Sequence, residues 1–137
     1  MSKKIISMLI ACVMLCSMTV TAFAATNYFS GSTGKMNSLN GLESAAWNVS
    51  SGSINTDSKV NSSGVAVNVT VSTGSSPFLL YVEAPNGIWY SRRIGSSGSV
   101  TFTEFNGQNA KGTWKVSIQT TGTVSTATAN LKVNYTY

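Results

Sequence analysis

Residues 105–137 read FNGQNAKGTWKVSIQTTGTVSTATANLKVNYTY, and this stretch decides the fold. Two segments within it alternate apolar and polar side chains, first at Trp114, Val116 and Ile118 and then from Ala127 to Tyr137. A period of two is typical of a β-strand with one face in a core and the other in water. A polar break over residues 120–125 separates the segments. We therefore predict a pair of neighbouring antiparallel strands that close a β-sandwich.

The same alternation continues upstream of this stretch. Valines recur at every second position of a predicted strand over residues 64–71, and further strands are expected over 78–84, 88–94 and 100–105. Ala84-Pro85-Asn86-Gly87 predicts a tight turn, because proline presets its own φ and Asn-Gly tolerates positive φ. Six strands from residue 64 onward, with one or two before it, predict an all-β antiparallel two-sheet sandwich, jelly-roll or immunoglobulin-like.

The region before residue 64 gives weaker signals. Tyr28 and Phe29 predict a short edge strand, and residues 31–41 are interpreted as a loop. Residues 45–49 hold an apolar cluster, interpreted as a strand that lies against the sandwich. Trp47 and Trp114 are both predicted to lie in the core. The second face of the 78–84 strand, which holds Leu79 and Tyr81, is expected to be covered as well.

The N-terminus has the three-part pattern of a secretory signal peptide. Lys3 and Lys4 precede an apolar run over residues 5–20, and Ala22-Phe23-Ala24 fits a signal-peptidase site. We predict export, cleavage near Ala24 and a single domain over residues 25–137. A membrane anchor and a lipoprotein box at Cys12 are the alternatives; the apolar run is short for a span, and Cys12 lies early within it.

The composition excludes several classes of function. Removal of residues 1–24 takes away Cys12, Cys16 and two lysines, so the net charge falls from +5 to +3. That excess forms no basic stripe, and we expect neither a nucleic-acid partner nor, after cleavage, a membrane. The sequence has no histidine and only four acidic residues, so no catalytic triad, metal site or cofactor is expected. Glu83 and Glu104, the one carboxylate pair placed on neighbouring predicted strands, are interpreted as solvated side chains.

Residues 64–137 resemble the P domain (P/Homo B) that follows the catalytic domain of proprotein convertases and bacterial subtilases. The resemblance depends on the loop and Gly-Thr-Trp strand of residues 105–118, on Leu80 to Gly87 and on the final strand over 129–135. The bacterial pre-peptidase C-terminal domain is similar but matches less well. The resemblance implies a jelly-roll sandwich that modulates an attached protease. It carries over no catalytic residue, and the chain is too short to hold a protease domain.

The candidate ligand-binding residues are Trp89, Arg93, Arg92 and Tyr81. On a strand over residues 88–94, Trp89 and Arg93 share one face, and Arg92 lies on the other. If Ile88 and Ile94 face the core, Trp89 and Arg93 face outward, where a tryptophan can stack on a sugar ring and a guanidinium can bind a carboxylate. The alternative is that Trp89 packs under a loop while the arginines keep a sheet edge soluble.

These observations predict a secreted, non-catalytic module that binds a protein or a polysaccharide, or has a structural role, at the bacterial cell surface or matrix. Two alternatives stay open. One is a structural protein that self-assembles through weakly charged edge strands. The other, from the resemblance alone, is an accessory, inhibitor or chaperone of an exported subtilisin-like protease.

Overall fold

A computed structural model describes residues 25–137, so the predicted signal peptide and both cysteines lie outside the described residues. Residues 25–137 form nine strands, which are β1 (Thr26–Ser32), β2 (Met36–Leu39), β3 (Trp47–Ser50), β4 (Lys59–Val71), β5 (Phe78–Glu83), β6 (Trp89–Ile94), β7 (Gly98–Phe102), β8 (Thr113–Thr120) and β9 (Val124–Thr136). In this part of the chain no helix is long and apolar enough to cross a membrane.

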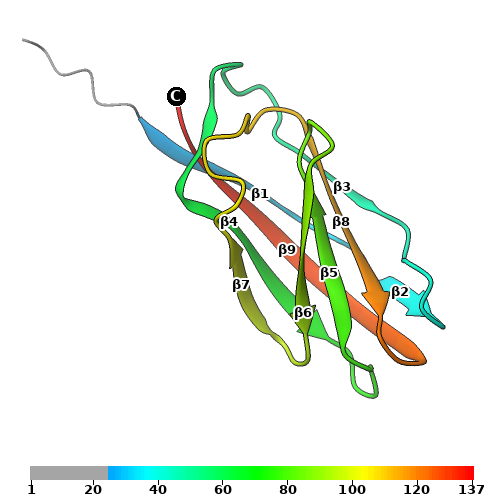
Figure 1. Cartoon of the computed structure of the whole chain (residues 1–137). Coiled ribbons are helices and arrows are strands. Elements are labelled where there is room, and N and C mark those ends of the chain that lie inside the picture. Colours follow the sequence, from blue (N-terminus) through cyan, green and yellow to red (C-terminus); the bar gives the residue numbers. More distant parts are fainter. Residues whose placement is uncertain (1–24) are drawn as a thin grey trace, which may run out of the picture.

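The strands form two antiparallel sheets, so the predicted all-β two-sheet sandwich is confirmed (Figure 1). One sheet has the order β1-β9-β4-β7, with β2 also paired to β9. The other has the order β3-β8-β5-β6. β1 pairs with residues 130–136 of β9 and β2 with residues 124–127, so together they make one interrupted edge strand.

The connections between strands identify the sandwich as a jelly roll. Among the described strands, with β1 and β2 counted as one, every connection crosses to the opposite sheet except the β5–β6 hairpin. An immunoglobulin sandwich instead keeps several sequential neighbours within one sheet. Ala84, Pro85, Asn86 and Gly87 make the β5–β6 turn as predicted: the Gly87 N–H donates to the Ala84 carbonyl at 2.9 Å, and Gly87 takes a φ of 87°.

The predicted pairing of the last two strands is wrong. β8 pairs with β3 and β5, whereas β9 lies in the opposite sheet between the β1–β2 edge and β4. Alternation shows that each strand buries one face, and both strands do so. It does not tell whether two such faces lie side by side in one sheet or pack against each other across the core.

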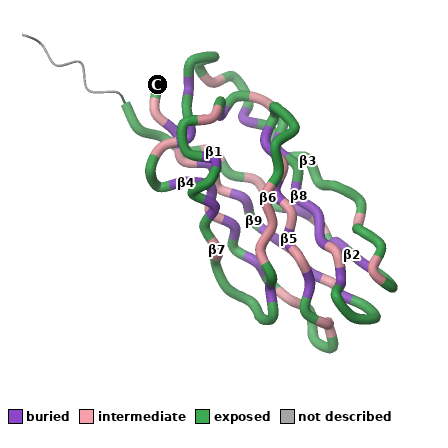
Figure 2. Tube along the Cα trace, viewed as in Figure 1, coloured by how far each residue is buried: buried purple, intermediate pink, exposed green. Residues whose placement is uncertain are grey.

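The core lies between the inner faces of the two sheets. Figure 2 shows buried residues along the strands, while the loops at both ends are mainly exposed. The largest fully buried side chains come from both sheets and from one loop; they are Trp114, Phe78, Phe102, Phe105, Met36, Leu80, Ile118 and Leu131. As predicted, Val65, Val67 and Val69 of β4 face this core.

An aromatic cluster joins the sheets at one end of the sandwich. Phe105, in the loop after β7, lies edge-to-face against Trp114 of β8 at 5.1 Å and against Tyr90 of β6 at 4.9 Å between ring centroids. The buried Trp114 indole donates a hydrogen bond to the Ala110 carbonyl at 2.9 Å. The loop thus contacts both layers through its side chains and its backbone.

The start of β4 depends on one glycine. The register of β4 against β9 shifts between Val60 and Val65, and Gly64 within this bulge has a φ of 69°. A Cβ at Gly64 would lie 2.8 Å from the Phe102 carbonyl oxygen. Glycine is therefore required by both the backbone conformation and the close approach of β7.

Three predictions for individual segments are wrong. Residues 31–41 are not all loop, since they contain the end of β1 and the whole of β2, with Met36 buried. Trp47 is 41% exposed, because β3 is an edge strand and the ring covers Gly34 at the rim of the sandwich rather than entering the core. The outer face of β5 is only half-buried, because no further layer covers this sheet within the described residues.

Replacement of Trp114 by alanine should destabilise the domain severely. The change leaves a cavity in the aromatic cluster and removes the hydrogen bond to Ala110, so we expect a loss of about 3–5 kcal/mol in the free energy of unfolding. Urea denaturation followed by circular dichroism measures it. Trp89→Ala, at a surface position, is the matched control and should change stability by less than about 0.5 kcal/mol. Equal losses for the two variants would contradict this account of the core.

Candidate functional site

The outer face of the four-stranded sheet carries side chains in rows that follow the strand register. One row across β6, β5, β8 and β3 is Trp89, Glu83, Lys115 and Asn48. The next row is Ser91, Tyr81 and Ser117, and the third is Arg93, Leu79, Gln119 and Glu43. Because side chains alternate between the faces of a strand, these rows lie outside while the residues between them form the core.

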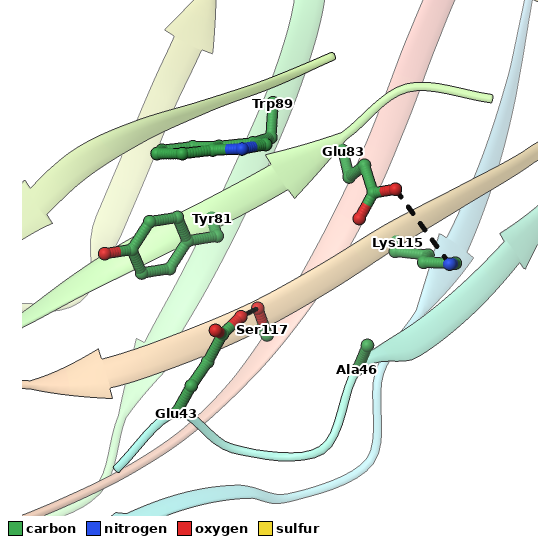
Figure 3. A pocket seen from close by; sticks show the side chains of 7 residues that line it. All are labelled: Glu43, Ala46, Tyr81, Glu83, Trp89, Lys115 and Ser117. Atoms are coloured by element: carbon green, nitrogen blue, oxygen red, sulfur yellow. Dashed lines mark hydrogen bonds and ion pairs between the residues drawn. The ribbon is translucent and has the colours of Figure 1, made fainter. Parts of the chain in front are cut away.

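Part of this face is hollowed. A hollow of about 340 Å³ is lined by Glu43, Ala46, Tyr81, Glu83, Trp89, Lys115 and Ser117. Figure 3 shows Trp89 on one side of the hollow and Glu43 on the other, with Tyr81 between them. Strands β5, β6 and β8 supply the base, and the segment between β2 and β3 supplies one wall.

Trp89 and Tyr81 form an aromatic corner in this hollow. Their ring centroids are 5.3 Å apart, and the ring planes meet at 66°. Trp89 follows the β5–β6 turn directly and is 57% exposed, whereas Tyr81 is half-buried. The short hairpin thus places the two rings diagonally on neighbouring strands and leaves the indole open to a ligand.

Hydrogen bonds hold the base and the wall in place. The Tyr81 hydroxyl donates to Gln119 Oε1 at 2.9 Å, and Gln119 Nε2 donates to the Gly41 carbonyl at 2.7 Å. The Ser117 hydroxyl donates to Glu43 Oε1. Residues 41–44 are further attached through the Ser44 N–H, which donates to the Ile118 carbonyl at 2.8 Å. The site is therefore built on strands and on a loop that is fastened to β8.

Charged groups line the hollow on two sides. Glu43 and Glu83 contribute carboxylates, and Lys115 is the one cation among its described lining residues. Lys115 Nζ lies 3.9 Å from Glu83 Oε1, and both side chains are more than one-third exposed. An ion pair this long and this open contributes little to stability, so Glu83 is available to a ligand.

The structure separates the four candidate residues that the sequence pattern suggested. Trp89 and Tyr81 lie together in the hollow. Arg93 is exposed on the same face but lies in another row, opposite Leu79 and outside the lining. Arg92 belongs to the inner face of β6, where its guanidinium lies 4.6 Å from the Phe102 ring centroid and pairs with Glu104. Of the two isoleucines whose burial would turn Trp89 outward, Ile94 is buried, and Ile88 is exposed because it precedes β6 within the turn.

Glu83 and Glu104 do not lie on neighbouring strands. Glu83 is at the end of β5, and Glu104 follows β7 in the opposite sheet. A backbone hydrogen bond, and then the hydrogen bond and charge of Arg92, hold the pKa of Glu104 below its ordinary value against the opposing effect of desolvation. The Arg92–Glu104 distance is 2.5 Å. The cation next to Glu83 is therefore Lys115, whereas the cation next to Glu104 is Arg92.

Sequence reasoning missed Glu43, Ser117 and Lys115 as members of this site. The polar positions of β8 did indicate its outward face, so Lys115 and Ser117 had a signal in the alternation. Glu43 had none, because its place depends on the fastening of residues 41–44 to β8. Within residues 25–137, no group of three or more His, Cys, Asp or Glu side chains is placed to hold a metal ion.

No protein-family model matches this chain, and no curated protein sequence matches it. Among solved structures, the crystal structure of FLHE aligns with a TM-score of 0.58 at 16% sequence identity. The alignment covers 85% of this chain and 100% of that chain. At this identity the likeness supports the β-sandwich fold alone, and it has no bearing on the P-domain resemblance.

Proposed function

We propose that this chain is an exported, non-catalytic binding module that recognises a saccharide through the outer face of its four-stranded sheet. One observation carries the proposal: an exposed tryptophan forms a corner with a tyrosine in a hollow that polar side chains surround. Export rests on the predicted signal peptide, and a setting at the bacterial cell surface or matrix rests on export.

The chemistry of the hollow suits a sugar. A pyranose ring has an apolar C–H face that packs on an aromatic ring, and its hydroxyl groups need hydrogen-bond partners around that contact. Trp89 offers an open indole surface for the first requirement. Lys115 and the two carboxylates offer donors and acceptors for the second.

The rigid base supports binding over catalysis. Tyr81, Gln119 and the Gly41 carbonyl form a chain of hydrogen bonds that holds the tyrosine in one orientation. A side chain that is held before the ligand arrives loses little further conformational entropy on binding. The non-catalytic assignment rests on the absence of histidine from the sequence and on the engagement of Glu43 with Ser117.

Replacement of Trp89 by alanine should abolish saccharide binding without loss of fold. The indole is the exposed aromatic surface of the hollow, so we expect affinity to fall by more than about tenfold for any saccharide that the protein binds. A glycan array, followed by calorimetry on the hits, measures the effect.

Tyr28→Ala is the matched control for this prediction. Tyr28 is 56% exposed, against 57% for Trp89, but it lies on β1 in the other sheet. Its replacement should leave binding unchanged. Hydrolysis of a bound saccharide by the purified protein would contradict the non-catalytic assignment, and equal loss of binding in both variants would contradict this site.

Self-assembly is a second candidate function, and the β1 edge favours it. β1 has the sequence TNYFSGS, which holds neither a charge nor a proline, and in the described structure its edge away from β9 has no strand partner. Charges and prolines are common protections of such edges, so β1 is open to pairing with another copy. The accessory role to an exported protease stays a proposal that rests on the resemblance alone.

If β1 mediates assembly, the purified protein should form dimers or larger species as its concentration rises. Ser30→Lys places a charge on this edge strand and should return the protein to a monomer. Sedimentation velocity over a concentration series measures both. A wild-type protein that stays monomeric at the highest concentration would rule out this candidate.

A further inference from the structure

We infer that the hollow selects a sugar that carries a positive charge, namely an amino sugar with a free ammonium group within a polysaccharide. This inference rests on the proposed saccharide binding and names the chemical class of the ligand. The evidence for it is that one hollow combines two aromatic rings (Trp89 and Tyr81), two carboxylates (Glu43 and Glu83) and Lys115, which makes only a long ion pair with Glu83.

The charge of the hollow is opposite to that of the chain. The sequence has nine basic and four acidic residues, yet two of those four, Glu43 and Glu83, line this hollow. The two residues are 40 positions apart and come together only through the fold. With Lys115 as the one cation among the described lining residues, the local charge is negative inside a protein whose overall charge is positive. The hollow is thus complementary to a cation.

The aromatic corner adds a second attraction for a cation. The faces of tryptophan and tyrosine carry negative electrostatic potential, and an ammonium group within about 6 Å of a ring centroid is attracted to it. The ring centroids of Trp89 and Tyr81 are 5.3 Å apart and the rings meet edge-to-face at 66°, so the edge of one ring lies against one face of the other, and a cation beside the pair approaches the faces that stay open. Cation binding over the faces of aromatic side chains is a known way of recognising ammonium groups.

Lys115 competes with such a ligand. Its Nζ is 3.9 Å from Glu83 Oε1 and its side chain is 47% exposed, so it can move into water when a ligand ammonium takes its place. Removal of the Lys115 charge should therefore strengthen the binding of a cationic ligand. For an anionic ligand the same change would weaken binding, so the sign of the effect discriminates between the two.

The arginines do not favour an anionic ligand at this site. Arg92 is engaged with Glu104 and the Phe102 ring on the inner side of β6. Arg93 lies opposite Leu79, two rows from Glu83, and does not line the hollow. An acidic sugar that stacked on Trp89 would instead place its carboxylate near Glu83, the residue paired with Trp89 across the two strands.

The test compares three hexasaccharides with the same backbone that differ only in the substituent at C2. Glucosamine, N-acetylglucosamine and glucose hexamers carry an ammonium, a neutral amide and a hydroxyl at that carbon. We expect the glucosamine hexamer to bind at least about tenfold more tightly than the other two by calorimetry, at mildly acidic pH and low salt. Added salt should reduce this preference, because it screens exposed charges.

Three charge variants test the residues. Glu83→Gln and Glu43→Gln should each reduce the preference for glucosamine several-fold, and Lys115→Gln should increase it. Glu104→Gln removes a carboxylate outside the hollow and is the matched control, for which the preference should not change. Thermal denaturation of each variant separates loss of binding from loss of fold.

The outcomes distinguish this inference from the proposed function. Binding of all three hexamers with equal affinity, or preference for a neutral one, would overturn the inference and leave the saccharide proposal standing. Binding of none of the three would overturn the inference, and absence of binding across the glycan array as well would overturn the saccharide proposal. If polylysine displaced the glucosamine hexamer at equal ammonium concentration, the hollow would recognise a cationic peptide, and the assignment to an amino sugar would be wrong.

Discussion

The structure depends on the packing of Phe105 between the two sheets. This residue lies in a loop, yet it is fully buried and contacts Trp114 and Tyr90 of one sheet and Phe102 of the other. Backbone hydrogen bonds fasten the same loop to the start of β4, where the Val60 N–H donates to Gln108 and the Gly107 N–H donates to Val60. With no cysteine among residues 25–137, the two layers stay together through apolar contact of this kind.

Side chains along each strand alternate between the two faces of the sheet, and this alternation places the core on one face of the four-stranded sheet and the candidate site on the other. On β5, Leu80 and Val82 are fully buried, while Tyr81 between them faces outward into the hollow. A one-residue slip of β5 against β8 would place Tyr81 in the core and Leu80 in water. The binding face is therefore fixed by the same hydrophobic burial that stabilises the sandwich. A rigid strand surface of this kind holds its side chains more firmly than a free loop does.

Much of the fold could be predicted from local pattern. The strand periods of β4, β5 and β9 and the turn at Pro85 to Gly87 are encoded within a few neighbouring residues, and all four occur as expected. Trp47 shows where reasoning from local pattern fails. Its pairing with Val116 turns the side chain toward the inner face of the sheet, but because β3 is an edge strand the ring stays at the rim of the sandwich. Within the candidate site, Trp89 and Tyr81 could be named from their strand positions, whereas Glu43 could not.

The sequence by itself determined that residues 25–137 are all-β, which residues of most strands face inward, and that the reactive groups are few. These properties follow from residue type and short-range spacing. Only the tertiary structure decided that β8 and β9 belong to opposite sheets and that Glu43 reaches Ser117 across 74 residues of chain. Each of these depends on pairing between distant segments, and a period of two carries no information about which distant strand will be the partner.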